Sequence, residues 1–238
     1  MEGLVLNNSK TTLVDDVEES LINYFKEKGL RPGSSIPNEV QLAESLGVGR
    51  SVVREALSRF KMTGMIVSRT KKGMILAEPS LVSGIKRCIN PFLMNSSTLD
   101  DILGLRVALE VGISSNIFRN ITPEDINELE EIVEMGEAIG NNKYTPVSEH
   151  RFHTKLYEIT GNKIISEFQD VIYPVLDFVK EKYHDDFEPI EEELSSQGEL
   201  VTHSDLLDHI KRGDLKGYKV AIEQHFRLYT IYLSRRGK

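Results

Sequence analysis

The sequence has a single cysteine, Cys88, among 238 residues. One thiol excludes a disulfide within the chain and is typical of a reducing compartment. No segment approaches the roughly 18 consecutive apolar residues that a membrane-spanning helix needs. Charged side chains interrupt the first twenty residues, so no secretory signal is expected. These absences predict a soluble cytoplasmic protein that makes no membrane contact.

Positive charge is scarce overall, since the net charge is −8, but it is unevenly distributed. Residues 1–78 carry a net charge of +1 and residues 79–238 a net charge of −9. Within the first segment, residues 50–72 hold seven Lys and Arg side chains and one acid. Salt limits each field to about 8–10 Å, so a local basic surface can bind phosphates on an acidic protein. Charge alone does not separate such a surface from a solvated helix face.

Apolar spacing in residues 1–78 predicts three helices followed by a short hairpin. The first helix is expected to begin at Thr12 and the second at Asn38, both residue types that cap helices. The third is expected over about residues 50–62, and two strands over 65–67 and 74–76. This order is that of a winged helix-turn-helix with a small β-hairpin wing.

The third predicted helix carries the residues that such a fold would present to DNA. In a helix-turn-helix, residues at the start of the second helix of the motif meet base edges in the major groove. Here they are Arg50, Ser51 and Arg54, and an arginine fork suits guanine. The basic turn of the hairpin, Lys71, Lys72 and Gly73, is expected at the adjacent DNA backbone or minor groove. The alternative is that the arginines only solubilise a small helical domain.

The rest of the chain is predicted to be a linker, residues 79–97, and an antiparallel α-helical bundle, residues 98–238. A short helix is expected within the linker. Bundle helices are expected at about residues 99–118, 123–139, 146–160, 163–183, 197–212 and 215–235. The acidic stretch from Asp185 to Glu193 is expected to be a solvated loop. The fold class is therefore mostly α.

Three histidines lie on the apolar faces of three different predicted helices: His153, His203 and His225. Glu149 precedes His153 by four residues, so both share one helix face. A lone histidine on such a face is more often a core residue, but three can converge on a metal ion, and imidazole suits zinc, nickel, copper or iron. The spacing favours a metal site slightly over a polar core.

Arg106 also falls on an apolar stripe, where it needs an anion. Glu110, one turn later, is the simplest partner. The alternative is that Arg106 binds the carboxylate of an effector, because an arginine fork accepts a carboxylate bidentately.

Residues 11–78 resemble the winged-helix domain of the GntR family of bacterial transcription regulators. The family signature L-G-V-S-R-T-P-V-R-E-A-L resembles residues 46–57, which read LGVGRSVVREAL. The resemblance places Arg50 and Arg54 on the DNA-contacting arginines of the family, Ser51 on its threonine and Gly73 on the glycine of the wing. Gly49 replaces a common serine, and Val40 stands where members of the FadR subfamily often carry a DNA-contacting arginine.

Residues 98–235 resemble the FCD ligand-binding domain of the FadR subfamily. Its metal-binding members carry Asp-x-x-x-His and two later histidines, which match Glu149, His153, His203 and His225 with Glu in place of Asp. His150 is a rival ligand at three-residue spacing. The R-x-x-L-E pattern from Arg106 to Glu110 supports the effector role of Arg106.

The resemblance implies a homodimeric repressor that binds a pseudo-palindromic DNA operator and is released by a small carboxylate effector. The expected cofactor is a divalent metal, zinc first, with nickel, manganese or iron as alternatives. Two other functions stay open on the residues alone. One is a metal-dependent hydrolase fused to a helix-turn-helix, and the other is a metal-free effector-binding regulator.

Overall fold

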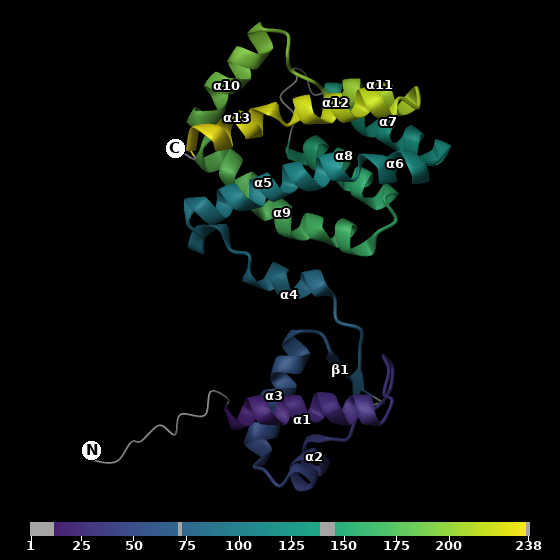
Figure 1. Ribbon diagram of the computed structural model, residues 1–238, viewed down its shortest axis with the longest axis vertical. Helices are drawn as coiled ribbons and strands as arrows, with labels where there is room; N and C mark the ends of the chain where they lie inside the picture. The colour runs from purple at the N-terminus through teal and green to yellow at the C-terminus, as the bar shows by residue number, and fades with distance from the viewer. Residues whose placement is uncertain (1–11, 71–72, 139–145, 237–238) are drawn as a thin grey trace, which may run out of the picture. The chain divides into compact units, whose positions relative to one another are not determined.

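The computed structural model describes residues 12–70, 73–138 and 146–236. The chain divides between Gly84 and Ile85 into two compact units, each with its own hydrophobic core. Figure 1 shows helices throughout both units and one small sheet in the first. The mostly helical fold class is confirmed. Among the described residues, no helix combines the length and the apolar character that crossing a bilayer requires.

The first unit contains α1 (Leu13–Glu27), α2 (Glu39–Leu46) and α3 (Arg50–Met62). Thr12 and Asn38 cap α1 and α2, and each takes part in a reciprocal capping box with the residue three positions later. Gly47 ends α2 in the left-handed region at φ 67°, which a residue with a Cβ rarely adopts. The sharp turn that follows sets the start of α3.

A hairpin completes the first unit. Strands β1 (Ile66–Arg69) and β2 (Gly73–Leu76) pair antiparallel, with Ile66 opposite Leu76 and Arg69 opposite Gly73. Ile66 is buried with the apolar residues of α1, α2 and α3. The winged helix-turn-helix predicted from the spacing is therefore present.

The second unit is an array of helices. After α4 (Leu81–Cys88) and a short 3₁₀ turn, Pro91–Leu93, its elements are α5 (Ser96–Gly112), α6 (Ser114–Asn120), α7 (Pro123–Ala138), α8 (Pro146–Ile159), α9 (Lys163–Lys182), α10 (His184–Ser196), α11 (His203–Lys211), α12 (Leu215–His225) and α13 (Arg227–Arg236). Helix α4 is the short helix expected in the linker.

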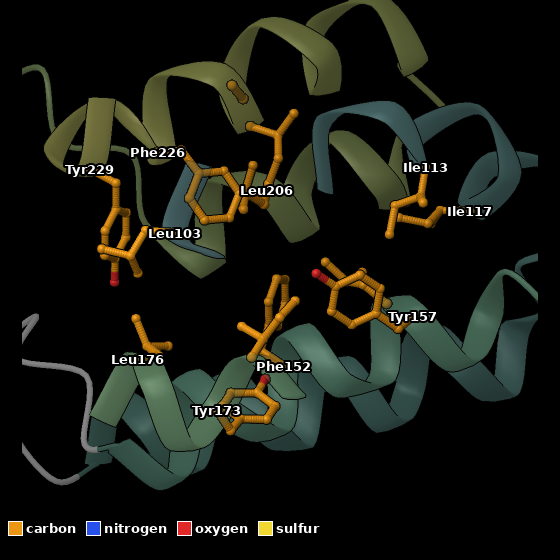
Figure 2. Close-up of a cluster of buried hydrophobic side chains, with 14 of the residues drawn as sticks. Leu103, Ile113, Ile117, Phe152, Tyr157, Tyr173, Leu176, Leu206, Phe226 and Tyr229 are labelled. Carbon is orange, nitrogen blue, oxygen red and sulfur yellow. The ribbon is translucent and has the colours of Figure 1, made fainter. Parts of the chain in front are cut away.

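One continuous core holds these helices together. Figure 2 shows Phe152 and Tyr157 of α8 and Leu176 of α9 pointing toward side chains of α5, α6, α11 and the C-terminal helices. Helix α5 packs against α9, α12 and α13, and α11 packs against α7 and α12. Several polar side chains described below are buried among the same helices.

The predicted loop at the acidic stretch is wrong, because these residues form α10. Phe187, Ile190 and Leu194 recur every three or four residues and are buried despite the acids between them. The Phe187 ring stacks on Tyr232 with a centroid distance of 4.3 Å. The many charged residues on the solvent face made the apolar stripe hard to recognise in the sequence. The helix expected at 197–212 is shorter and corresponds to α11.

Two expected helices are each divided in two. The one predicted over 99–118 is interrupted at Ile113, where the Ser114 hydroxyl donates to the Val111 carbonyl at 2.7 Å. The one predicted over 215–235 is interrupted at Phe226, directly after His225. Gly112 directly precedes the first interruption, whereas no Gly or Pro stands next to the second.

Candidate metal centre and nucleic-acid interface

The exposed face of α3 carries the three residues predicted to meet DNA. Arg50, Ser51 and Arg54 are exposed, whereas Val53 and Leu57 on the opposite face are fully buried. Gly49 precedes α3 and supplies no side-chain cap to the first N–H groups of the helix. A helix start of this kind is a site where a phosphate is favourable.

Two further charged residues of this unit were not predicted as part of a DNA-binding surface. Glu39 at the start of α2 accepts a hydrogen bond from Arg54 Nε at 3.3 Å, so it orients the arginine, whose side chain stays 63% exposed. Arg69 is an exposed cation at the end of β1. Gly73 begins β2 with φ 68°, and Lys71 and Lys72 lie outside the described residues.

The second unit brings together the four side chains that the sequence predicts as metal ligands. Glu149 and His153 lie one turn apart on α8, His203 is the first residue of α11, and His225 is the last residue of α12. One potential ligand atom from each lies within 4.8 Å of all the others. His150, the rival ligand, is exposed and lies outside this cluster.

The spacing of the donor atoms fits a single cation. His153 Nε2 is 3.2 Å from His203 Nε2 and 3.3 Å from His225 Nε2. Glu149 Oε1 and Oε2 are 3.5 Å from His153 Nε2 and 3.4 Å from His203 Nε2. Bonds of about 2.0–2.2 Å to one tetrahedral metal would separate neighbouring donors by roughly 3.4 Å. The residues present therefore fit a divalent metal.

Contacts at Nδ1 orient the imidazole rings of His153 and His225. His153 Nδ1 contacts Glu110 Oε2, and His225 Nδ1 donates to the Val201 carbonyl at 2.8 Å. A carbonyl can only accept, so neutral His225 carries its proton on Nδ1 and leaves Nε2 as a lone pair. Such outer partners fix the tautomer and orientation of metal-binding histidines.

Burial keeps His203 and His225 in the neutral form, which is the form that can coordinate a metal ion. Burial lowers the pKa of His203 to about 4, and burial together with the neighbouring His203 and His153 lowers the pKa of His225 to about 3. Both rings are therefore neutral at pH 7. Burial opposes ionisation of Glu149, but Lys180 and His153 outweigh it and hold the pKa of this carboxyl well below its usual range. Neutral imidazoles facing a carboxylate are the chemistry that a transition metal prefers.

Arg106 is buried next to the cluster and is not exposed to solvent. Its Nε donates to Glu110 and its Nη2 to Glu149, both at 2.8 Å, and its side chain is 1% exposed. Glu110, the partner predicted from the sequence, is therefore one of two acids that Arg106 contacts. Arg106 Nη1 is buried and has no hydrogen-bond partner in the described part of the chain.

A cavity of about 740 Å³ opens beside the cluster. Glu149 and His225 line it, together with Lys180 of α9 and one face of α10. The Lys180 side chain is 33% exposed, and its Nζ lies 3.7 Å from Glu149 Oε1.

Sequence reasoning missed Lys180 and the second contact of Glu110. Glu110 carried a usable signal, because an acid on an apolar stripe must meet a buried polar partner. Lys180 carried no such signal, because it lines the same cavity as α10, and that stretch was expected to be a loop. Whether these residues bind a metal or an effector stays a prediction.

Comparison with known families matches both units. The profile of the bacterial regulatory proteins of the gntR family matches residues 13–76, and that of the FCD domain matches residues 101–228. The regulator LutR of Bacillus subtilis is 27% identical over 153 residues, 64% of this chain and 70% of its own. The repressor NanR of Klebsiella aerogenes is 28% identical over 160 residues, 66% of this chain and 62% of its own.

The fold also resembles solved structures. A GntR protein of Streptococcus agalactiae superposes with a TM-score of 0.53, covering 95% of this chain and all of its own. The two sequences are 22% identical, so this likeness concerns the fold alone.

Proposed function

We propose, from the premise that this chain belongs to the gntR family of bacterial regulatory proteins and carries an FCD domain, that it represses transcription until a small organic acid binds beside a metal ion in its C-terminal unit. The family and the relatives are DNA-binding transcriptional regulators rather than enzymes. The observation that carries the proposal is the convergence of one carboxylate and three imidazoles from α8, α11 and α12.

The DNA-binding part of the proposal assigns base contacts to Arg50 and Arg54 and a phosphate contact to Ser51. The exposure of all three, opposite the buried face of α3, supports it. Lys71, Lys72 and Gly73 of the hairpin are proposed to contact the DNA backbone or minor groove. Regulators of this family typically act as dimers, so we propose a homodimer on a pseudo-palindromic operator, working in the cytoplasm.

The metal part assigns Glu149, His153, His203 and His225 as ligands. Zinc is the first expectation, and nickel, manganese or iron suit the same donors. When bound, the cation supplies an electrophilic centre that a carboxylate oxygen can coordinate. The chain's own contribution is the orientation of His153 by Glu110 and of His225 by the Val201 carbonyl.

Arg106 is proposed to take part in effector binding. Its enclosed guanidinium holds Glu110 and Glu149, and Glu149 lines the cavity, so Arg106 is proposed to act on the effector through the position of Glu149. Binding of the acid is proposed to shift the population of conformations that grip DNA. Repressor activity is supported by the likeness to NanR, whose name describes a transcriptional repressor.

Metal content is the first test. Wild-type protein purified without chelator should contain one divalent metal per chain by elemental analysis. His203→Ala should lose it, because a buried ligand is removed. His150→Ala should keep it, since His150 is exposed and outside the cluster. Metal-free wild type, or equal metal content in both variants, would contradict the assigned site.

Effector control is the second test. The metal-loaded chain is titrated with a library of carboxylates on DNA selected for tight binding, and the affinity is read by gel shift. At least one acid should weaken the complex, and chelation should abolish that response. Unchanged affinity with every acid would count against the sensor function and leave a DNA-binding protein with another input.

A further inference from the structure

The cavity beside the metal cluster has two chemically different ends. At the inner end lie Glu149, His225 and Lys180. At the outer end lies one face of α10, where Glu188, Glu191 and Glu192 line the cavity. Positions three and four apart share a helix face, so the three carboxylates form one wall. A ligand that fills the cavity meets both ends.

Lys180 is the cation that such a ligand meets at the inner end. Its distance of 3.7 Å to Glu149 Oε1 is beyond hydrogen-bond range, although the two charges attract. The ammonium lies above the Tyr229 ring at 6.0 Å from its centroid. It is one-third exposed, unlike Arg106, whose guanidinium is enclosed by the protein. Lys180 is therefore placed to receive an anionic group.

The carboxylates of the α10 wall have no cation of their own. In the part of the chain that the structure describes, Glu188, Glu191 and Glu192 form no salt bridge, whereas the adjacent Glu193 pairs with Arg235 at 3.3 Å. Carboxylates are acceptors only, so they favour ligand groups that donate hydrogen bonds and disfavour a second anion. The rest of the lining includes the apolar or aromatic side chains Phe187, Leu200, Val201, Leu228 and Tyr229, which can pack against the carbon chain of the ligand.

We infer that the effector is an acid with a single anionic end, held beside Lys180, and a far end rich in hydroxyl or ammonium groups, held by Glu188, Glu191 and Glu192. This inference rests on the proposed function, because it assigns the substrate class of the same pocket. It excludes dicarboxylates of similar length, since their second carboxylate would face the acidic wall.

Two matched pairs of acids test the inference by isothermal titration calorimetry on the full-length, zinc-loaded chain. The first pair is gluconate and glucarate, and the second is 6-aminohexanoate and adipate. Within each pair the length is equal and only the far end changes, from a donor to a carboxylate. We expect the monocarboxylate of each pair to bind at least about tenfold more tightly, since the second carboxylate of its partner acid is repelled by Glu188, Glu191 and Glu192.

Variants separate the two ends of the pocket. Glu191→Gln combined with Glu192→Gln should reduce the discrimination within each pair several-fold. Glu193→Gln, on the same helix but paired with Arg235, should leave it unchanged. Lys180→Met should weaken gluconate and 6-aminohexanoate, and Lys180→Arg should restore most of the loss. Zinc content is measured on every sample.

The outcomes distinguish this inference from its premise. Zinc bound, with adipate and glucarate binding as tightly as their partners, would overturn the inference and leave the proposed function standing. Zinc bound, with discrimination unchanged in the double Gln variant, would overturn the role of the α10 wall. No binding of any of the four acids to the zinc-loaded chain would overturn the inference together with the effector part of the proposed function.

Discussion

Each unit contains an arginine surrounded by carboxylates, but the two arginines lie in opposite environments. Arg59 of α3 lies 2.8 Å from Asp15 and 3.1 Å from Glu55, and its side chain is 37% exposed. Arg106 of α5 pairs with two acids at 2.8 Å and is 1% exposed. The first network joins α1 to α3 at the surface, and the second lies between α5 and α8 beside the candidate metal cluster.

The difference in burial decides which of these charges a binding partner can reach. Exposed ion pairs are screened by water and exchange their partners readily, so the first unit can present its cations to DNA. Buried charges must be paired inside the protein, because an unpaired one is strongly unfavourable. The second unit accordingly uses Arg106 to hold two acids, one of which contacts His153 and the other of which belongs to the candidate metal cluster.

The largest expected effect comes from removing the buried arginine. Arg106→Met leaves Glu110 and Glu149 without their cation, and we expect the free energy of unfolding of the second unit to fall by about 3–5 kcal/mol in the presence of chelator. Urea unfolding followed by hydrogen-exchange mass spectrometry measures each unit by its own peptides.

The control for this change is Arg59→Met, which also removes an arginine from a group of acids. We expect a much smaller loss in the first unit, because water solvates the acids that remain. Equal losses in the two variants would remove the distinction between the surface network and the buried one.

An intermediate effect concerns DNA binding rather than stability. Arg54→Ala should weaken binding to the selected operator by about 1–3 kcal/mol if the arginine bonds a base, as should Arg50→Ala. Stability should change little, since Arg54 is mostly exposed. Lys61→Ala, exposed at the other end of α3, is the control, and fluorescence anisotropy gives the affinities. An Arg54→Ala variant that binds like wild type would exclude base reading by this side chain.

The smallest effect is the pH dependence of the surface network. The Thr12 N–H and hydroxyl, followed by Arg59, lower the pKa of Asp15 from 3.8 to about 2. A carboxyl whose pKa is lower in the folded state stabilises the fold above its unfolded pKa. That contribution is lost as the pH falls from about 4 toward 2.

Asp15→Asn should therefore flatten the pH dependence of the first unit's thermal midpoint between pH 4 and pH 2, as measured by circular dichroism. Asp16→Asn, its exposed neighbour in the first turn of α1, should retain the wild-type dependence. Identical curves for the two variants would assign the dependence to other acids.

Much of the fold was predictable because its signals are local. Thr12 and Asn38 start helices through their own side chains, and Gly47 ends one through its backbone freedom. The acidic α10 could not be predicted in this way, because several acids separate its buried residues. The interruption at Phe226 has no Gly or Pro beside it, and Gly112 before Ile113 is a weak signal because a single glycine is tolerated inside a helix.

The candidate site was predictable in part for a similar reason. A histidine on an apolar face stands out in a sequence, so His153, His203 and His225 could be named. Lys180 did not stand out, because a lysine near the end of a helix is ordinary. Its importance comes from the carboxylates of α10 that line the same cavity, and their position depends on how α9 and α10 pack.

The order of the elements, the polar groups that a core would have to accommodate and the exposed cations of α3 could be read from the sequence, because each depends on residues within a few turns of one another. Three other features came only from the folded chain: Glu110 contacts both Arg106 and His153, the Nε2 atoms of His203 and His225 lie within 3.3 Å of His153 Nε2, and acids of α10 line the cavity beside them. Distances between side chains from separate helices depend on packing, and packing is a property of the whole core.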